Sequence, residues 1–556
     1  MKVSRRDLLV WSAGAAAGLM VTPVPWKVLD DVSIWSQNWP WIPQPARGPV
    51  DVKQSACTLC PKGCGLRVRV AGGFLVGVAG VASHPVTRGA LCPLAFGAHQ
   101  LNWHPQRLRT VLHRRSVSTW NAAQMAFTKA CSEGPVVVID GYPGRAASQV
   151  LESFAKNRRG EYRVVLSAET RALAPYERWT GVPAALLGYD VENAGTIVSF
   201  GAPLLDGWGA PGHFTRLWAD RAAGMNDPQL RLIQVEPTLS RTASRAWQWV
   251  PVRNGSEAVL AAGIAGVLLE EHLVSARGPK PTLSLTAAGE QTGLGIDAIR
   301  GLARTIVARP PVVAIANDDS PEVAALNVVL GAVGARGGIV RRSRENKSYL
   351  AADTPISSAR AVVIDSSVPW DFAPKTDAEV FRFAAWDGGS GSADWLLPAP
   401  GFLEEATDVP AAPELAVQSF ALAPALTKAQ HEVRSAALFL SGIDSALPTA
   451  EEIIHARCQQ IFQSRVGMLC SREQTPVSRF AASQKLEEQL WAGAVWVGEP
   501  VGPPNLRCEL KEWSTPSTST RGEGWSSSWT APVLPPLASK LVEESGLRQR
   551  AEGRLA

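Results

Sequence analysis

The chain of 556 residues lacks several features that mark common classes of protein. It has no run of lysine and arginine and a formal net charge of only +5, so nucleic-acid binding is not indicated. Its N-terminal apolar stretch, residues 11–21, is shorter than the ~20 residues of a membrane-spanning helix. Tyrosine and methionine are scarce, with five of each against 20 tryptophans. A Trp-rich core, extensive subunit interfaces or a membrane-facing surface would each account for that excess.

Four of the eight cysteines form a pattern that predicts a metal site. Cys57, Cys60 and Cys64 have the spacing C-x2-C-x3-C, and Cys92 follows after 27 further residues. Three thiolates close together, with a fourth from farther along the chain, suit a 4Fe–4S cluster. Structural zinc sites usually pair two C-x-x-C hooks, and an oxidising compartment also allows two disulfides. We therefore predict a cluster held by these four residues, with zinc and disulfides as the alternatives.

The other four cysteines have no ligand spacing. We expect Cys131, Cys458, Cys470 and Cys508 to be buried free thiols, with a Cys458–Cys470 disulfide as the alternative outside the cytoplasm.

The residues around the first three cysteines predict a tight loop beside a hairpin. Pro61, Gly63 and Gly65 permit a partly left-handed backbone. Alternating apolar residues at 66–70, a Gly-Gly pair and a second apolar run at 74–76 predict a β-hairpin. The predicted cluster module covers residues 48–115.

The N-terminus carries an export signature. Residues 4–10, Ser-Arg-Arg-Asp-Leu-Leu-Val, form a twin-arginine motif followed by the apolar stretch. This route exports folded proteins, which suits a chain whose cluster is built before it crosses the membrane. We expect residues 1–30 to be a signal, cleaved or kept as an anchor, and residues 31–47 to be an extended Trp- and Pro-rich arm.

From about residue 116 the pattern becomes that of an α/β fold. Short apolar runs end in turn or acidic residues at 136–140, 197–201, 232–236, 312–316 and 361–365. Such runs between amphipathic stretches, clearest at 257–271 and 321–330, predict parallel sheets covered on both faces. We expect one discontinuous α/β domain at 116–160 and 345–500, a second, Rossmann-like domain at 161–344, and an irregular tail at 501–556.

Several segments in order resemble the molybdopterin oxidoreductase family. They are the cluster module with His104-Pro105-Gln106-Arg107-Leu108, residues 189–194 and 200–201, Val235-Glu236-Pro237 with residues 242–243 and 251–258, residues 326–331 with Gly337-Gly338, and residues 393–398 with Glu404. The resemblance implies an N-terminal iron–sulfur module and two doubly wound α/β domains. It also implies, as the family's second cofactor, a molybdenum bis-pterin group.

Departures from the family pattern predict that the molybdenum site is lost. The family usually has Lys or Arg two residues after the last cluster cysteine, where this chain has Leu94, which cannot hydrogen-bond or carry charge. The family's nucleotide-binding Pro-Gly-Thr-Asp segment has Asn254 and Glu257 at its first and last positions here. No cysteine lies between Cys131 and Cys458 to serve as a molybdenum ligand, although Ser167 and Thr180 supply hydroxyls nearby. The family's C-terminal β-barrel domain is expected to be missing or vestigial.

Within the family, the Trp-rich arm and residues 201–209 most resemble the molybdopterin-like subunits of periplasmic menaquinone reductase complexes, relatives of alternative complex III. That resemblance implies an electron-transfer subunit on the periplasmic side of the cytoplasmic membrane. The implied partners are a multihaem cytochrome c, a ferredoxin-like iron–sulfur subunit and an integral quinone-binding subunit. A complete molybdenum oxidoreductase acting on an oxyanion or sulfur compound, and a purely structural platform, are the alternatives. No catalytic acid, base or nucleophile is predicted.

Overall fold

The computed structural model describes residues 4–21, 27–28, 48–60, 62–223, 227–275, 279–342, 350–352, 356, 358–365, 376–386, 393–410, 415–416, 418–499, 506, 508, 510 and 513. The predicted Trp-rich arm and most of the predicted tail lie outside these residues. The chain divides into residues 1–50 and 51–556, and each part is described by itself.

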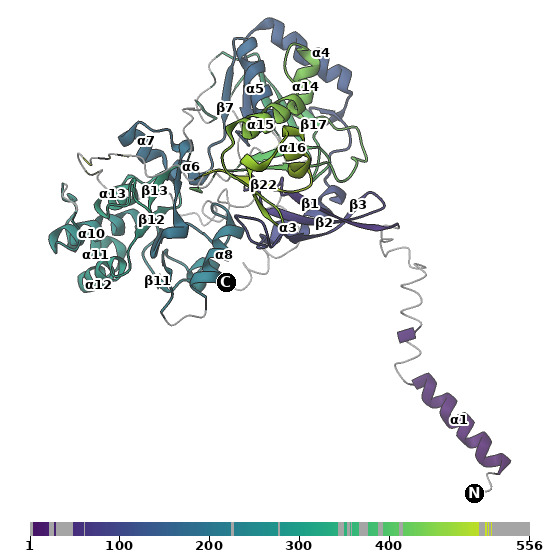
Figure 1. The fold of residues 1–556 in the computed structure, drawn as a ribbon, viewed down its shortest axis with the longest axis horizontal. Helices are drawn as coiled ribbons and strands as arrows, with labels where there is room; N and C mark the ends of the chain where they lie inside the picture. The colour runs from purple at the N-terminus through teal and green to yellow at the C-terminus, as the bar shows by residue number, and fades with distance from the viewer. Residues whose placement is uncertain are drawn as a thin grey trace. The chain divides into compact units, whose positions relative to one another are not determined.

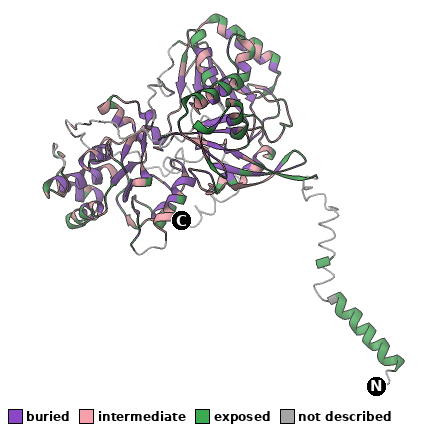
Figure 2. Cartoon of the chain, in the orientation of Figure 1, coloured by how far each residue is buried: buried purple, intermediate pink, exposed green. Residues whose placement is uncertain are grey.

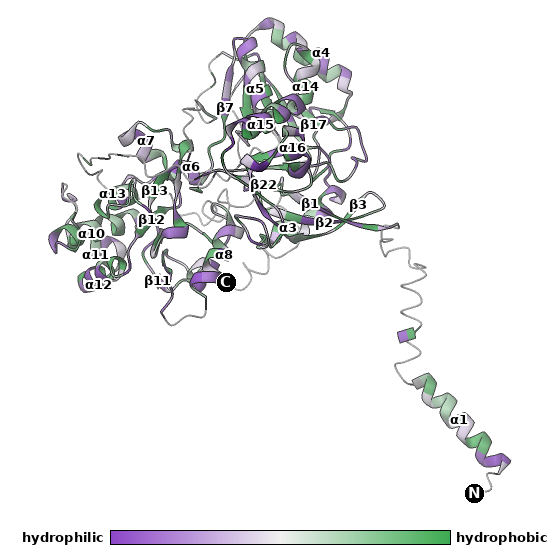
Figure 3. Ribbon diagram, viewed as in Figure 1, coloured by the Kyte–Doolittle hydropathy of each residue, from purple (hydrophilic) through white to green (hydrophobic). Residues whose placement is uncertain are grey.

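In the first part, helix α1 (Arg5–Val21) covers the arginine pair of the predicted twin-arginine motif. Ser4 begins it: the Ser4 hydroxyl accepts from the Asp7 amide at 3.2 Å and donates to the Asp7 carboxylate at 2.6 Å. These hydrogen bonds from Ser4 lower the pKa of Asp7. The helix surface is exposed (Figure 2), and its polar residues cluster at the N-terminal end (Figure 3). Among the described helices, none combines the length and the hydropathy needed to cross a membrane.

The cluster module begins the second part with a three-stranded sheet in the order β1 (Val50–Ala56), β2 (Gly65–Ala71) and β3 (Phe74–Gly80). β2 and β3 pair antiparallel, so the predicted hairpin is present. Its two turn residues, Gly72 and Gly73, have φ values of +57° and +84°, which favour glycine. A short helix, α3 (Pro93–Gly97), and a 3-10 helix (Ala98–Trp103) follow the fourth cysteine of the predicted site.

The first α/β domain is built on an eight-stranded sheet. Its strands, in spatial order, are β14 (Leu350–Ala351), β7 (Glu161–Val164), β6 (Val136–Asp140), β15 (Ala361–Ile364), β16 (Glu379–Ala384), β17 (Trp395–Pro398), β4 (Leu112–His113) and β5 (Ser116–Val117). The first six are parallel, and β4 and β5 form an antiparallel edge. Its helices are α4 (Trp120–Glu133), α5 (Ala146–Asn157), α14 (Ala436–Ile443), α15 (Ala450–Ser464) and α16 (Ser483–Trp491) (Figure 1).

Both faces of this sheet are buried, as the continuous apolar runs predict. Val136 and Val138 of β6 belong to one hydrophobic cluster, while Val137 and Ile139 belong to another. Alternate residues of a strand point to opposite faces, so the two clusters lie on the two sides of the sheet.

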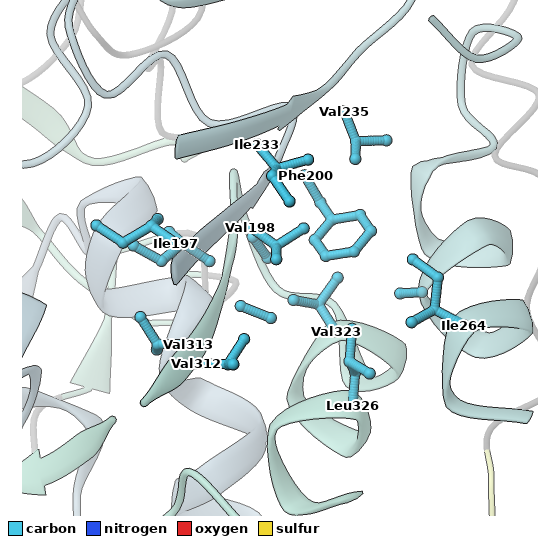
Figure 4. Close-up of a cluster of buried hydrophobic side chains, with 14 of the residues drawn as sticks. Ile197, Val198, Phe200, Ile233, Val235, Ile264, Val312, Val313, Val323 and Leu326 are labelled. Atoms are coloured by element: carbon cyan, nitrogen blue, oxygen red, sulfur yellow. The ribbon is translucent and has the colours of Figure 1, made fainter. Parts of the chain in front are cut away.

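The second α/β domain has a four-stranded parallel sheet in the order β11 (Gln248–Val250), β10 (Arg231–Val235), β9 (Thr196–Phe200) and β12 (Val312–Ala316). A two-stranded sheet of β8 (Leu187–Tyr189) and β13 (Ile339–Arg341) accompanies it. Its helices are α6 (Ala168–Ala172), α7 (Ala174–Thr180), α8 (Pro211–Arg221), α9 (Arg241–Arg245), α10 (Glu257–Glu270), α11 (Leu285–Thr292), α12 (Ile296–Val307) and α13 (Pro321–Val329). Figure 4 shows Phe200 of β9 facing Ile264 of α10 and Val323 of α13.

The predicted helices at 257–271 and 321–330 are present as α10 and α13, but α10 is not amphipathic. Ten of its 14 residues are buried, including the consecutive stretch from Val259 to Ala265. Helices α11, α12 and α13 all contact α10, so apolar residues are needed on nearly all of its sides.

Two predicted domain boundaries need correction by a few residues. β7 (Glu161–Val164), placed in the second domain from sequence, pairs in parallel with β6 in the first sheet. β4 (Leu112–His113), placed in the cluster module, pairs with β17 in that same sheet. In both places the strand continues a sheet whose neighbouring strand lies in the adjoining predicted segment.

A five-stranded sheet is the fifth sheet of the described residues. It contains β18 (Thr407–Pro410), β19 (Ser419–Ala423), β22 (Val495–Val497), β20 (Met468–Cys470) and β21 (Gln474–Pro476), and its neighbouring strands pair antiparallel. Beyond it, Trp513 of the predicted tail is buried in the core of the second α/β domain and donates its indole N–H to the Pro279 carbonyl at 2.8 Å. At that residue the predicted tail is anchored on the second domain.

Candidate iron-sulfur site

The four predicted ligands lie at the ends of elements in the cluster module. Cys57 follows β1, Cys64 precedes β2, and Cys92 immediately precedes α3. The Cys57 amide donates to the Cys64 carbonyl at 2.8 Å, which closes the loop that carries Cys60. Gly63 has a φ of +62°, so the predicted left-handed turn is present at this position.

The three thiols of the loop and that of Cys92 lie in electrostatic range of one another. Burial is the largest influence on Cys57, Cys60 and Cys64: it raises the pKa of Cys60 to about 12 and raises the pKa values of Cys57 and Cys64 well above the ordinary range. The neighbouring thiols, that of Cys92 included, raise all three pKa values again. Such thiols become thiolates only beside strong positive charge, which bound metal supplies.

This arrangement fits a cluster. Among the described residues, no three His, Cys, Asp or Glu side chains are placed to hold a single metal ion. The ligands of a 4Fe–4S cluster need not meet at a single ion, because the four thiolates hold the cluster between them. Backbone amides also reach the sulfurs: Leu59 N–H donates to Cys57 and Lys62 N–H to Cys60, and both lower the thiol pKa. Hydrogen bonds of this kind tune a cluster's potential.

A buried ion pair beside the loop was not predicted from sequence. The Lys62 ammonium lies 2.9 Å from the Glu169 carboxylate of α6, with side-chain exposures of 7% and 8%. Although burial opposes it, Lys62 and hydrogen bonds from Ser167 hold the pKa of Glu169 below its ordinary value. The only available signal was that Lys62 is the sole charged residue between Cys57 and Cys64.

The His84 side chain packs against Gly65, at the end of the cysteine loop. It is buried, and its Nδ1 accepts from the Val86 and Thr87 amides at 3.3 and 3.1 Å. Burial lowers the pKa of His84 to about 4, so the ring is neutral. A Cβ at Gly65 would lie 2.4 Å from the His84 ring. Glycine is therefore needed at position 65 because of this close approach, rather than for the left-handed backbone that we predicted.

A network of buried charges lies at the carboxyl ends of β6 and β15, next to Cys60. The Arg145 guanidinium donates to Asp140 at 3.3 Å and also to Asp365. Burial raises the pKa of Asp140, partly offset by Arg145. Tyr142, in the same loop as Arg145, donates its hydroxyl to the Leu59 carbonyl and so ties the cluster loop to this edge.

The space between the network and the loop is small. A cavity of about 30 Å³, lined by Cys60, Tyr142, Arg145 and Asp408 among others, has room for about two water molecules.

Comparison with known proteins agrees with this geometry. Residues 50–100 match the molybdopterin oxidoreductase Fe4S4 domain. Over 364 residues the chain is 30% identical to the menaquinone reductase, molybdopterin-binding-like subunit of Nitratidesulfovibrio vulgaris, covering 61% of this chain and 52% of that protein. The chain is a relative of the molybdopterin oxidoreductases. The predicted family resemblance is confirmed.

Other relatives of the molybdopterin oxidoreductases match more weakly. The major subunit of the nitrate-inducible formate dehydrogenase of Escherichia coli is 24% identical over 317 residues, covering 50% of this chain and 30% of that protein. The match thus spans about half the length, or less, of each of these two relatives. Among solved structures, acetylene hydratase from Pelobacter acetylenicus has the same fold, with a TM-score of 0.61 at 12% identity over 87% of this chain and 79% of that one.

Two of the segments quoted for the family resemblance meet in space. Arg107 and Glu404, 297 residues apart, form an ion pair with side-chain exposures of 5% and 4%. Arg107 also donates to the Ala385 and Ala399 carbonyls at 3.0 and 3.1 Å. The pair therefore joins the cluster module to the first α/β sheet.

Other segments of the molybdopterin oxidoreductase pattern have structural roles in the second domain. Asn327 is fully buried and exchanges hydrogen bonds with the Ala314 amide and carbonyl, at 2.8 and 2.7 Å, beside the edge strand β12. The Asp190 carboxylate accepts from the Gly337 amide at 2.8 Å.

The departures from the family pattern are visible at their predicted positions. Leu94 is half-buried in α3. Glu257 begins α10, and burial followed by the nearby Glu236 raises its pKa. The Ser167 hydroxyl caps α6 and the Thr180 hydroxyl donates to the Tyr176 carbonyl at 2.6 Å, so both have local structural partners.

The remaining cysteines are all free thiols, and Cys458 and Cys470 form no disulfide. These two are buried as expected, but Cys131 and Cys508 are half-buried.

Proposed function

We propose that the chain is an electron-transfer subunit of a membrane-associated quinone reductase complex, and that Cys57, Cys60, Cys64 and Cys92 hold one 4Fe–4S cluster. The observation that carries the proposal is that three of these thiols share one loop whose amides donate to sulfur, with the thiol of Cys92 in electrostatic range of all three. The similarity to a menaquinone reductase subunit supports the quinone reductase part.

The cluster would supply one-electron transfer when bound, and the chain's own residues do the rest. Cys57 and Cys64 are 3% exposed, so the loop excludes water from half of the ligand set. Two hydrogen bonds fix the loop, one from the Tyr142 hydroxyl to the Leu59 carbonyl and one from the Cys57 amide to the Cys64 carbonyl. A fixed, dry setting favours electron transfer, because little rearrangement accompanies a change in charge.

We also propose that the molybdenum bis-pterin cofactor is not bound. Leu94 offers no hydrogen bond, and the region next to Cys60 is crossed by the Arg145, Asp140 and Asp365 ion network. Glu257 and Glu236 bring two carboxylates together where the family binds its pterin nucleotide.

The proposed setting of the chain comes from its N-terminus and its relatives. The twin-arginine motif on α1 supports export to the periplasmic side of the cytoplasmic membrane. A multihaem cytochrome c, a ferredoxin-like iron–sulfur subunit and an integral quinone-binding subunit are the proposed partners. Within the chain, we propose the domain order predicted above with the two boundaries corrected.

One experiment tests these proposals together. The native complex is purified through a tag on this chain, and iron, sulfide, molybdenum and tungsten are measured per chain alongside the subunit composition. Because the proposed partners also contain iron, the same complex with Cys60→Ser is the baseline: we expect about four irons more than that complex contains, and neither heavy metal. Stoichiometric molybdenum or tungsten with extractable pterin would instead establish a catalytic molybdoenzyme, the function that the formate dehydrogenase similarity favours. A cluster that dithionite and quinol-coupled partners cannot reduce would indicate a structural platform.

A further inference from the structure

The Lys62–Glu169 ion pair is placed where it acts on the cluster ligands. Lys62 lies in the loop between Cys60 and Cys64, and Glu169 comes from the second α/β domain, 107 residues later. A buried ion pair is costly to desolvate and adds little net stability. Stabilisation of the fold therefore does not account for this pair beside the proposed ligands.

The pair is held in one orientation. Glu169 accepts from the Lys62 ammonium at 2.9 Å and from the Gly209 amide, both through the same carboxylate oxygen. Gly209 has a φ of +64° and lies between β9 and α8, so two segments of the second domain fix the carboxylate. The second domain thereby fixes the carboxylate, while the ammonium that it holds belongs to the cysteine loop.

Lys62 is two residues from both Cys60 and Cys64 in the chain, and its ion pair with Glu169 is buried, so water screens its charge little. The Glu169 carboxylate comes from another domain, 107 residues later, so the cationic end of the pair is the end that belongs to the cysteine loop. The net field of the pair therefore favours negative charge at the ligands.

We propose that Lys62 is a positioning residue that sets the reduction potential of the cluster, and that Glu169 holds and moderates its charge. This inference rests on the proposed cluster ligands. A fixed positive charge beside the ligands stabilises the reduced cluster, which carries one more negative charge, and so raises its potential. The pair would give this chain a cationic group next to the cluster from within the cysteine loop, although position 94 holds a leucine.

The test is a redox titration of the purified complex, followed by the EPR signal of this chain's reduced cluster, in Lys62→Met, Lys62→Arg and Glu169→Gln variants. We expect the midpoint potential to fall in K62M, to rise in E169Q and to stay close to the wild-type value in K62R. Shifts of opposite sign are the decisive result, because a purely structural clamp would weaken the fold in both variants without moving the potential in opposite directions.

Glu404→Gln is the matched control. It breaks the Arg107–Glu404 ion pair, which is as buried as Lys62–Glu169. Burial lowers the pKa of Arg107 and Glu404 raises it. We expect E404Q to lower the melting temperature and to leave the potential unchanged.

Three outcomes would overturn the proposal: no shift in K62M and E169Q with the cluster retained, shifts of the same sign, or a shift in E404Q as large as theirs. If K62M does not assemble its cluster, E169Q decides, since a raised potential supports the proposal and an unchanged one refutes it. Wild-type complex without iron in this chain would be a different failure, that of the proposed function, and iron and sulfide analysis before the titration identifies it.

Discussion

The cysteine loop at 57–64 and the segment at 251–258 both resemble the same family, yet they differ in what they keep. The loop has three of the four proposed ligands, amide donors to the sulfurs of Cys57 and Cys60, and a buried cation at Lys62. In the other segment Glu257 stands where the family has aspartate, and burial together with Glu236 raises its pKa. Glutamate is one methylene longer than aspartate, so its carboxyl group lies farther from the backbone at this position.

The difference teaches that one scaffold can preserve its two cofactor regions separately. The Asn327 and Asp190 hydrogen bonds join parts of the second domain's own fold. Similarity along the whole chain therefore shows the scaffold, while each site has to be judged from its own residues.

The largest effect that would break the comparison is expected from Cys60→Ser. Serine is a poor ligand for iron, so we expect this variant to lose the visible absorbance and the reduced-state EPR signal of the cluster. The matched control is Cys131→Ser, which changes a half-buried free thiol outside the site and should keep both signals. Unchanged spectra in C60S would contradict the ligand assignment.

A large effect on stability, but not on the cluster, is expected from Arg145→Met. The substitution leaves Asp140, fully buried, and Asp365 without their shared cation. Because Arg145 is itself 21% exposed, we expect a loss near the low end for a broken buried pair, about 3 kcal/mol, in denaturant unfolding of the full chain.

Arg114→Met is the control for that variant. It breaks the Arg114–Asp394 pair, in which the arginine side chain is 74% exposed, and should cost less than about 1 kcal/mol. Equal losses of unfolding free energy in the two variants would mean that the Arg145 ion network stabilises the fold no more than an exposed ion pair does.

The sequence predicted the scaffold well because its strands are marked locally. The five apolar runs are β6, β9, β10, β12 and β15, and burial on both faces is what makes them continuously apolar. The prediction that α10 is amphipathic was wrong, because the helices that cover its other sides come from later in the chain. Spacing alone also selected the four cysteines proposed as ligands, and three of them share one short loop.

The surroundings of the site could not be predicted in the same way. Lys62 meets Glu169 across 107 residues, and no pattern in either segment specifies the other. The Arg107–Glu404 pair was within reach, since both residues lie in segments that resemble the family, but resemblance did not say that they touch. Tertiary ion pairs depend on the placement of whole domains, which local periodicity does not contain.

A moderate effect is expected from Gly65→Ala, which tests how tightly the loop is supported. The added methyl group would lie 2.4 to 2.8 Å from three atoms of the His84 side chain, which is itself buried. We expect overpacking to cost about 1–3 kcal/mol of unfolding free energy. Gly301→Ala is the control, because nothing lies within 4 Å of that position in the exposed side of α12. It should stabilise the chain by about 0.5–1 kcal/mol, and a loss in G301A equal to that in G65A would remove the argument from His84.

The smallest effect is expected from Leu94→Lys, which restores the family's usual basic residue after the last cluster cysteine. Leu94 is half-buried in a short helix, so a lysine can direct its ammonium to water, and we expect a change in stability of no more than about 0.5 kcal/mol. We also expect iron, molybdenum and tungsten contents equal to those of the wild type, because the Arg145 network and the Glu257–Glu236 pair remain. Molybdenum appearing in L94K after expression in a host that makes the pterin would show that one side chain separates the two regions, and the wider loss proposed here would be wrong.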